Sequence, residues 1–171
     1  MKFVFSILLV CSLVSCQTST LDYSVVVVGD GVVDSSFVDK IDEPARMLMG
    51  WYLFAYGNEC GLENKKPKCQ ILNLLSVNNE CDTVYLGALR KWFKDDMYRS
   101  IKLKKCPSLS AKGAIQNEFK YLYLERHQDT LSISYRVDGL NNSQEKSWNV
   151  ERVERFIVVD NSLLSVRDKN N

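Results

Sequence analysis

In the second half of the chain, apolar and polar residues alternate with a period of two. From Leu131 to Val137 every odd-numbered residue is apolar and every even-numbered one is polar. Alternation of this kind is typical of an antiparallel strand with one covered and one solvated face. Strands are also predicted in segments 119–124, 148–159 and 163–166, which gives four antiparallel strands after Gly113.

Two irregularities in this half predict how the sheet turns and bends. The segment 138–145 is polar and predicts a loop. The step from Val150 to Val153 is three residues, which breaks the alternation. A phase slip inside a strand indicates a bulge, here near Glu151, and a bulge bends the sheet.

The first half of the chain has a helical period instead. Between Ser36 and Tyr56, apolar residues recur at spacings of three and four, as on one face of a helix. Pro44 marks either a kink or the first turn of the helix after Asp42. Gly57-Asn58 follows the periodic stretch and predicts its end, because both residues tolerate a left-handed backbone.

Shorter elements complete this half. Residues 69–75 predict a short helix, and a longer one begins at the capping residue Asp82 and buries a stripe that ends at Met97. Residues 101–103 predict a strand or an extended arm. The β-branched run in 23–28 predicts a strand that turns at the following glycines, with Val32-Val33 pairing back.

Helices followed by four antiparallel strands predict an α+β fold, with N-terminal helices packed on a curved four-stranded sheet. This order resembles the nuclear transport factor 2-like (cystatin-like cone) superfamily, and within it small bacterial lipoproteins. Gly50-Trp51-Tyr52-Leu53 resembles an aromatic run of those lipoproteins, and the strands from Trp148 to Val166 resemble their final hairpin. The resemblance implies a cone with an open mouth.

Two other architectures stay open. One is a different α+β arrangement of the same elements. The other is a lipocalin-like barrel, since Gly50-Trp51-Tyr52 is similar to the opening motif of that family. The motif lacks its intervening residue here, and the helical middle leaves too few strands to close a barrel of eight.

The N-terminus has the pattern of a secretory signal. Lys2 precedes an apolar run that is too short to span a bilayer. Leu13-Val14-Ser15-Cys16 resembles a bacterial lipobox, in which the cysteine is acylated after cleavage. We therefore predict a signal peptide at 1–15, a lipidated tether at 16–22 that begins with Cys16, and a single domain at 23–171.

This prediction places the protein in the bacterial cell envelope. Gln17 favours the outer membrane, because it is not the aspartate that resembles an inner-membrane retention signal. Ordinary cleavage and secretion is the alternative. The chain carries 22 Lys and Arg against 21 Asp and Glu. It therefore has no basic field to hold nucleic acid, and that class of partner is excluded.

The remaining cysteines indicate an oxidising compartment. Apart from Cys11 in the leader and Cys16, the chain has an even number of cysteines, as expected for disulfides. They are Cys60, Cys69, Cys81 and Cys106. We favour the pairs Cys60–Cys69 and Cys81–Cys106, which close local loops. A metal site is disfavoured because none of the spacings is that of a zinc knuckle.

Candidate chemistry is sparse, and no cofactor is predicted. His127 is the only histidine, so a catalytic triad would have one possible member. Enzymes of the cone superfamily often place an aspartate base and a tyrosine donor in the mouth. The resemblance therefore implies Asp138 with Tyr121, Tyr123 or Tyr135.

The favoured hypothesis is a non-catalytic envelope lipoprotein that binds a protein partner or a small ligand through the cleft between helices and sheet. An inhibitor or an immunity factor would fit this description. Aromatic residues dominate binding energy. The candidates are Trp51, Tyr52, Trp92, Tyr121, Tyr123, Tyr135 and Trp148.

Two alternatives stay open: a small cone enzyme and a structural lipoprotein. The form of the cavity distinguishes the cone enzyme from a binding protein. A deep pocket with a carboxylate in hydrogen-bond reach of a tyrosine favours catalysis, and a filled cone with an exposed aromatic patch favours binding. Oligomeric state is not predicted.

Overall fold

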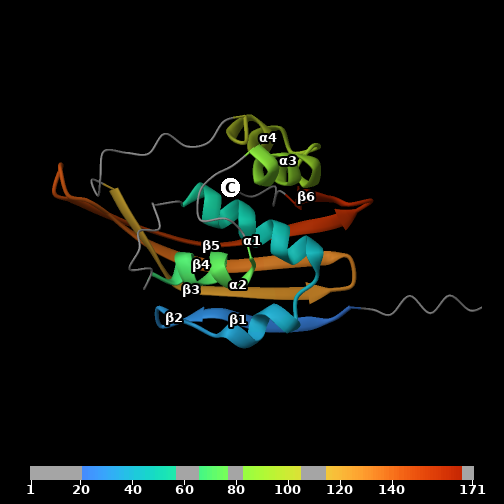
Figure 1. Cartoon of the computed structure of the whole chain (residues 1–171), viewed down its shortest axis with the longest axis horizontal. Coiled ribbons are helices and arrows are strands. Elements are labelled where there is room, and N and C mark those ends of the chain that lie inside the picture. Colours follow the sequence, from blue (N-terminus) through green and yellow to red (C-terminus); the bar gives the residue numbers. More distant parts are fainter. Residues whose placement is uncertain (1–20, 57–65, 77–82, 105–114, 167–171) are drawn as a thin grey trace, which may run out of the picture.

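The computed structural model describes residues 21–56, 66–76, 83–104 and 115–166. They form an α+β fold with a six-stranded antiparallel sheet in the order β2-β1-β3-β4-β5-β6 (Figure 1). The predicted signal peptide, Cys16 and most of the predicted tether lie outside the described residues. The strands are β1 (Tyr23–Gly29), β2 (Val32–Val33), β3 (Ile115–His127), β4 (Thr130–Asn141), β5 (Lys146–Val159) and β6 (Ser162–Val166).

The four strands predicted after Gly113 are confirmed as β3 to β6, but the sheet has six strands because the N-terminal hairpin belongs to it as well. β1 pairs antiparallel with β3, from Tyr23 opposite Arg126 to Val28 opposite Leu122. The valines of β1 that face the helices are fully buried, so the hairpin shares the core of the domain. Joining the sheet satisfies the backbone of β1 and buries its β-branched side chains at once.

The sheet is irregular in β3 and in β1, and β5 is regular. The register between β3 and β4 shifts between Phe119 and Tyr121. Phe119 therefore faces the core, while Tyr121 shares the other face with Tyr123. The register of β4 with β5 is continuous, so the predicted bulge near Glu151 was wrong.

The predicted loop at 138–145 was too long. β4 continues to Asn141, and Gly139 lies opposite Trp148 on β5. A Cβ at Gly139 would overlap the Trp148 indole. The missing side chain thus lets the indole lie against the strand, and the pair extends the sheet into the polar segment.

The helices begin at capping side chains. Asp42 accepts a hydrogen bond from the backbone N–H of Ala45 at the start of α1 (Glu43–Ala55), and Pro44 lies in its first turn. Pro44 therefore marks the beginning of the helix, not a kink. A short 3-10 helix, η1 (Ser35–Asp39), precedes α1, and α2 (Pro67–Leu74) confirms the predicted short helix.

The helix predicted from Asp82 to Met97 is two helices. α3 (Thr83–Trp92) ends before the predicted limit, and Asp96 caps a new helix, α4 (Met97–Lys102). Met97 is 75% exposed, so it does not end a buried stripe. Residues 101–103 are not extended, because α4 continues to Lys102. The predicted cap Asp82 lies outside the described residues.

All the described helices lie on one face of the sheet. Figure 1 shows α1 crossing the sheet in front of β4 and β5, with α3 and α4 beside it toward β6 and η1 along β1. The core lies between these layers and includes Phe37, Leu48, Leu89, Leu122, Ile133 and Phe156. In the described part of the chain, no helix is long and apolar enough to cross a membrane.

The cysteines can be followed only in part. Cys69 on α2 is 2% exposed and is disulfide-bonded. Cys60, Cys81 and Cys106 lie outside the described residues, so no disulfide is seen between two described cysteines. The predicted pairing stays a prediction.

Candidate functional site

A cavity of about 260 Å³ lies where α1 and α4 meet β4 and β5. α1 contributes Trp51 and Tyr52 to its wall, and β4 contributes Tyr135. These three belong to the predicted binding residues, although they are far apart in the sequence. The cavity is therefore the place where the fold gathers the predicted aromatic side chains.

The charged centre of this site is Arg99, a residue of α4 that the sequence did not single out. Its guanidinium Nη1 donates to Asp96 Oδ2 at 2.6 Å, and Nη2 donates to Glu154 Oε2 at 2.5 Å. Arg99 is only 6% exposed. Because Glu154 lies on β5, this arginine ties the short helix α4 to the sheet.

Aromatic rings surround the same guanidinium. The Arg99 Cζ atom lies 4.8 Å from the centroid of the Phe156 ring and 5.5 Å from that of Trp51. Guanidinium groups stack favourably on aromatic faces, more so when water is excluded. The rings therefore offset part of the cost of burying this charge.

Three tyrosines of the cavity lining, Tyr52, Tyr56 and Tyr135, bring hydroxyl groups to the site. The hydroxyls of Tyr56 and Tyr135 are 3.1 Å apart, and the Tyr135 hydroxyl donates to Glu154 Oε1 at 3.2 Å. Burial, and then the hydrogen bond with Tyr56, raises the pKa of Tyr135. This phenol is therefore neutral at physiological pH and acts as a hydrogen-bond group.

The hydroxyl of Tyr52 differs from its neighbours. Tyr52 is 1% exposed and its ring lies 4.8 Å from that of Tyr135. Its Oη makes no hydrogen bond of good geometry with a described residue, although Glu154 and Arg99 lie close enough to act on its pKa. Burial, and then the charge of Glu154, raises its pKa. A buried hydroxyl without a partner costs about 1–3 kcal/mol. Tyr52 thus keeps a poorly satisfied hydroxyl buried behind the cavity wall.

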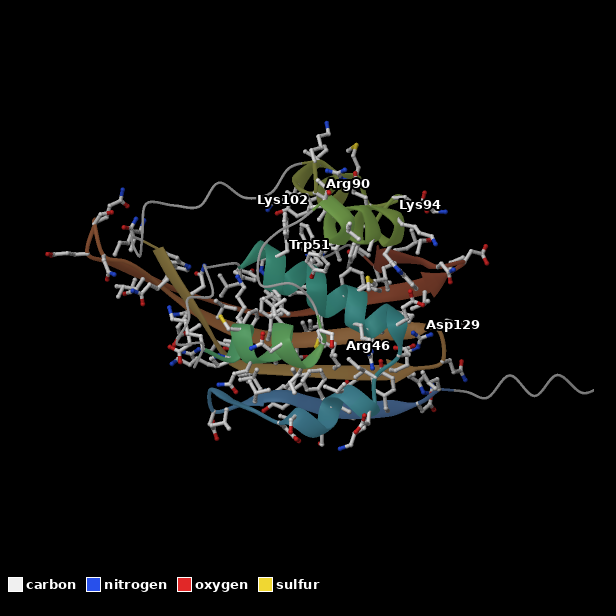
Figure 2. All side chains as sticks on the ribbon, viewed as in Figure 1. Arg46, Trp51, Arg90, Lys94, Lys102 and Asp129 are labelled. Atoms are coloured by element: carbon white, nitrogen blue, oxygen red, sulfur yellow. The ribbon has the colours of Figure 1, made fainter. Side chains whose placement is uncertain are left out.

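Two cations stand at the solvent side of the cavity. Lys102 ends α4, with its Nζ 4.4 Å above the ring of Tyr98, and Arg152 projects from β5 opposite Tyr135. Neither side chain has an ion pair or a hydrogen bond within the described ranges. Figure 2 shows Lys102 and Trp51 on the helix side of the sheet.

The other predicted residues lie elsewhere. Trp92 is 5% exposed and packs in the core. Tyr121 and Tyr123 stack on each other on the sheet face away from the helices, with ring centroids 5.3 Å apart. Trp148 covers Gly139 near the start of β5. These residues do not reach the cavity.

The structure does not bring Asp138 to Tyr135. Asp138 accepts a hydrogen bond from Arg136 Nε at 3.1 Å on the opposite face of β4. The carboxylate beside Tyr135 is Glu154 instead. The exposed His127 makes an ion-pair contact of 3.3 Å with Asp22, far from the cavity in the fold.

The sequence analysis missed Arg99, Arg152 and Glu154 because two local predictions were wrong. Arg99 was hidden because residues beyond Met97 were expected to be extended. Arg152 and Glu154 were hidden by the supposed bulge. With β5 regular, they take the inward positions between Val150 and Phe156. Two charged residues at inward positions of a strand were the signal that could have found the site.

No protein-family model, curated protein or solved structure matches the chain. The geometry of the cavity therefore carries the functional argument.

Proposed function

We propose that this protein is a non-catalytic lipoprotein of the bacterial envelope that binds a small ligand in the cavity between α1, α4 and β4–β5. The lipid on Cys16 would hold the domain at the membrane, most favourably the outer membrane. The relationship to the cone superfamily belongs to the same proposal, because helices on one face of an antiparallel sheet suit that fold. Mass spectrometry of the mature N-terminus tests the lipid directly.

The observation that supports binding is the Tyr52 hydroxyl. A fold that keeps a polar atom buried without a partner in the described chain forgoes stability at that point. A ligand that displaces side chains at the cavity wall would reach this atom and supply the hydrogen bond. Aromatic walls with a few convergent polar groups are also the usual composition of small-molecule sites.

The size of the cavity favours a small ligand over a large protein surface. Small-molecule sites usually enclose roughly 300–1,000 Å³, and this cavity of about 260 Å³ lies just below that range. A protein partner that inserts one side chain is the competing occupant. It becomes an outcome of the test.

A second candidate is a small enzyme that uses Glu154 with Tyr135, since their hydrogen bond meets the criterion for catalysis. Against it, Glu154 already accepts hydrogen bonds from Arg99 and Tyr135. A general base needs a free lone pair aimed at the substrate proton. The pair is therefore better suited to hold the wall of a binding site.

The test uses the acylated protein purified from its own membranes in mild detergent. Ala55 lines the cavity, so Ala55→Trp should fill it. Gly87 on α3 has open space around it and supplies the matched control Gly87→Trp. Native mass spectrometry should show a small molecule retained by the wild type and by Gly87→Trp but lost from Ala55→Trp.

Two results would contradict the proposal. One is an acylated protein that carries no small molecule in any preparation. The other is retention of the molecule by Ala55→Trp. If crosslinking instead captures a protein whose contact is lost in Ala55→Trp, the cavity takes a partner's side chain and the small-ligand proposal fails.

A further inference from the structure

The cavity also indicates what charge its ligand carries. Five charged side chains line it: Asp96, Arg99, Lys102, Arg152 and Glu154. Both carboxylates are ion-paired with Arg99, and the five formal charges of the lining sum to +1, which favours an anionic ligand. Of the three cations that line the cavity, Lys102 and Arg152 have no ion pair with a described residue.

These two cations are placed to act together. Lys102 comes from the end of α4 and Arg152 from the middle of β5, and both line the same cavity. Charge-assisted hydrogen bonds from lysine and arginine are about twice as strong as neutral ones. An anion between them would be held by both elements.

The inner wall sets the rest of the ligand. Trp51 and Tyr98 contribute aromatic rings to the lining, and the Tyr52 hydroxyl is buried behind it, where a ligand hydroxyl would reach it once the wall side chains shift. A flat body with a hydroxyl at one end and an acid at the other would contact all of these groups. Because aromatic faces pack well on flat rings, the wall favours a ring-bearing molecule.

The geometry points to a small hydroxylated organic acid, with its carboxylate at Lys102 and Arg152 and its body against Tyr52. This inference rests on the proposed binding function. It adds a sign of charge and an orientation that the proposed function does not contain.

The test compares three probes of one shape: 4-hydroxyphenylacetate, its neutral amide, and tyramine. Isothermal titration calorimetry at fixed ionic strength measures their affinity for the acylated protein. We expect the acid to bind at least about tenfold more tightly than the amide, and tyramine to bind weakest.

Two double variants locate the effect. In Lys102→Gln with Arg152→Gln, the advantage of the acid over the amide should fall to about threefold or less. In Lys91→Gln with Arg155→Gln the net charge changes equally at exposed positions outside the cavity lining, and the advantage should persist. Circular dichroism of both variants checks that the fold is retained.

The outcomes separate this inference from the binding function. Equal binding of acid and amide, or an acid advantage that survives in the cavity variant, overturns the inference and leaves the binding function standing. Failure of all three probes also overturns it, while the retained molecule of the native preparation still decides the function. If the native preparation holds no molecule either, both fail together.

Discussion

Arg99 on α4 donates to Glu154 on β5 at 2.5 Å, and this contact joins a six-residue helix to the sheet. An isolated helix of this length is not stable, so α4 depends on tertiary contacts. Asp96 contributes twice, since it caps the helix and accepts from Arg99. The wall of the cavity therefore depends on this charged cluster for its stability.

Replacement of Arg99 should destabilise the protein strongly. Arg99→Met leaves two partly or fully buried carboxylates without their cation, which costs about 3–5 kcal/mol. Urea unfolding followed by circular dichroism measures the loss. The exposed Arg155→Met should change stability by less than about 0.5 kcal/mol. A loss below about 1 kcal/mol for Arg99→Met would contradict the structural role of the cluster.

The two neighbouring tyrosines should respond differently to loss of their hydroxyls. Tyr52→Phe removes a group without a partner in the described chain, so stability of the ligand-free protein should stay equal or rise by about 1 kcal/mol. Tyr135→Phe removes the bonds to Tyr56 and Glu154 and should cost about 1–2 kcal/mol. Chemical denaturation of both variants compares them. Equal losses would show that Tyr52 has a partner in the protein.

Gly139 should be required because of Trp148. Gly139→Ala displaces the indole and should cost about 1–3 kcal/mol. In a Trp148→Ala background the same substitution should be close to neutral, so the double-mutant cycle should give a coupling of about 1 kcal/mol or more. Additive losses would mean that the indole does not lie on the glycine in solution.

Lys68 should make stability depend on pH above neutrality. Burial, and then the charge of Lys66, lowers the pKa of Lys68 from 10.5 to about 8. Between these pH values the unfolded chain binds more protons at this site than the folded chain, so its contribution to stability rises with pH. Below pH 8 the protein bears the full cost, at most about 3 kcal/mol.

The comparison with Lys68→Met isolates this effect, because tyrosines also titrate near the top of the window. The variant should be more stable than the wild type at pH 7, and the difference should shrink as pH rises from 8 to 10.5. Unfolding free energies at several pH values provide the measurement. A difference that is constant with pH would place the pKa of Lys68 near its ordinary value.

Most helices and strands could be predicted from periodicity, but the pairing of distant strands could not. The alternation in 131–137 fixed the faces of β4, and Pro44 after Asp42 marked the start of α1. The hairpin of β1 and β2 was recognised locally, but its pairing with β3 joins residues about a hundred positions apart. Local patterns carry no information on such pairing, so the sheet was predicted two strands too small.

Recognition of the site depended on two local predictions, and both were wrong. Charged residues at inward positions looked like a phase slip in β5, because strands usually bury apolar side chains. The exception is stable here because Glu154 meets Arg99 from another element. That partner became visible only when α4 was recognised as a helix of its own.

The most direct test of the central claim is a high-resolution structure of the protein isolated from its natural source. We predict a bound small molecule in the cavity, with one atom in hydrogen-bond distance of Tyr52 Oη. A cavity that holds only solvent, or a Tyr52 hydroxyl bonded to a group of the protein itself, would contradict the account.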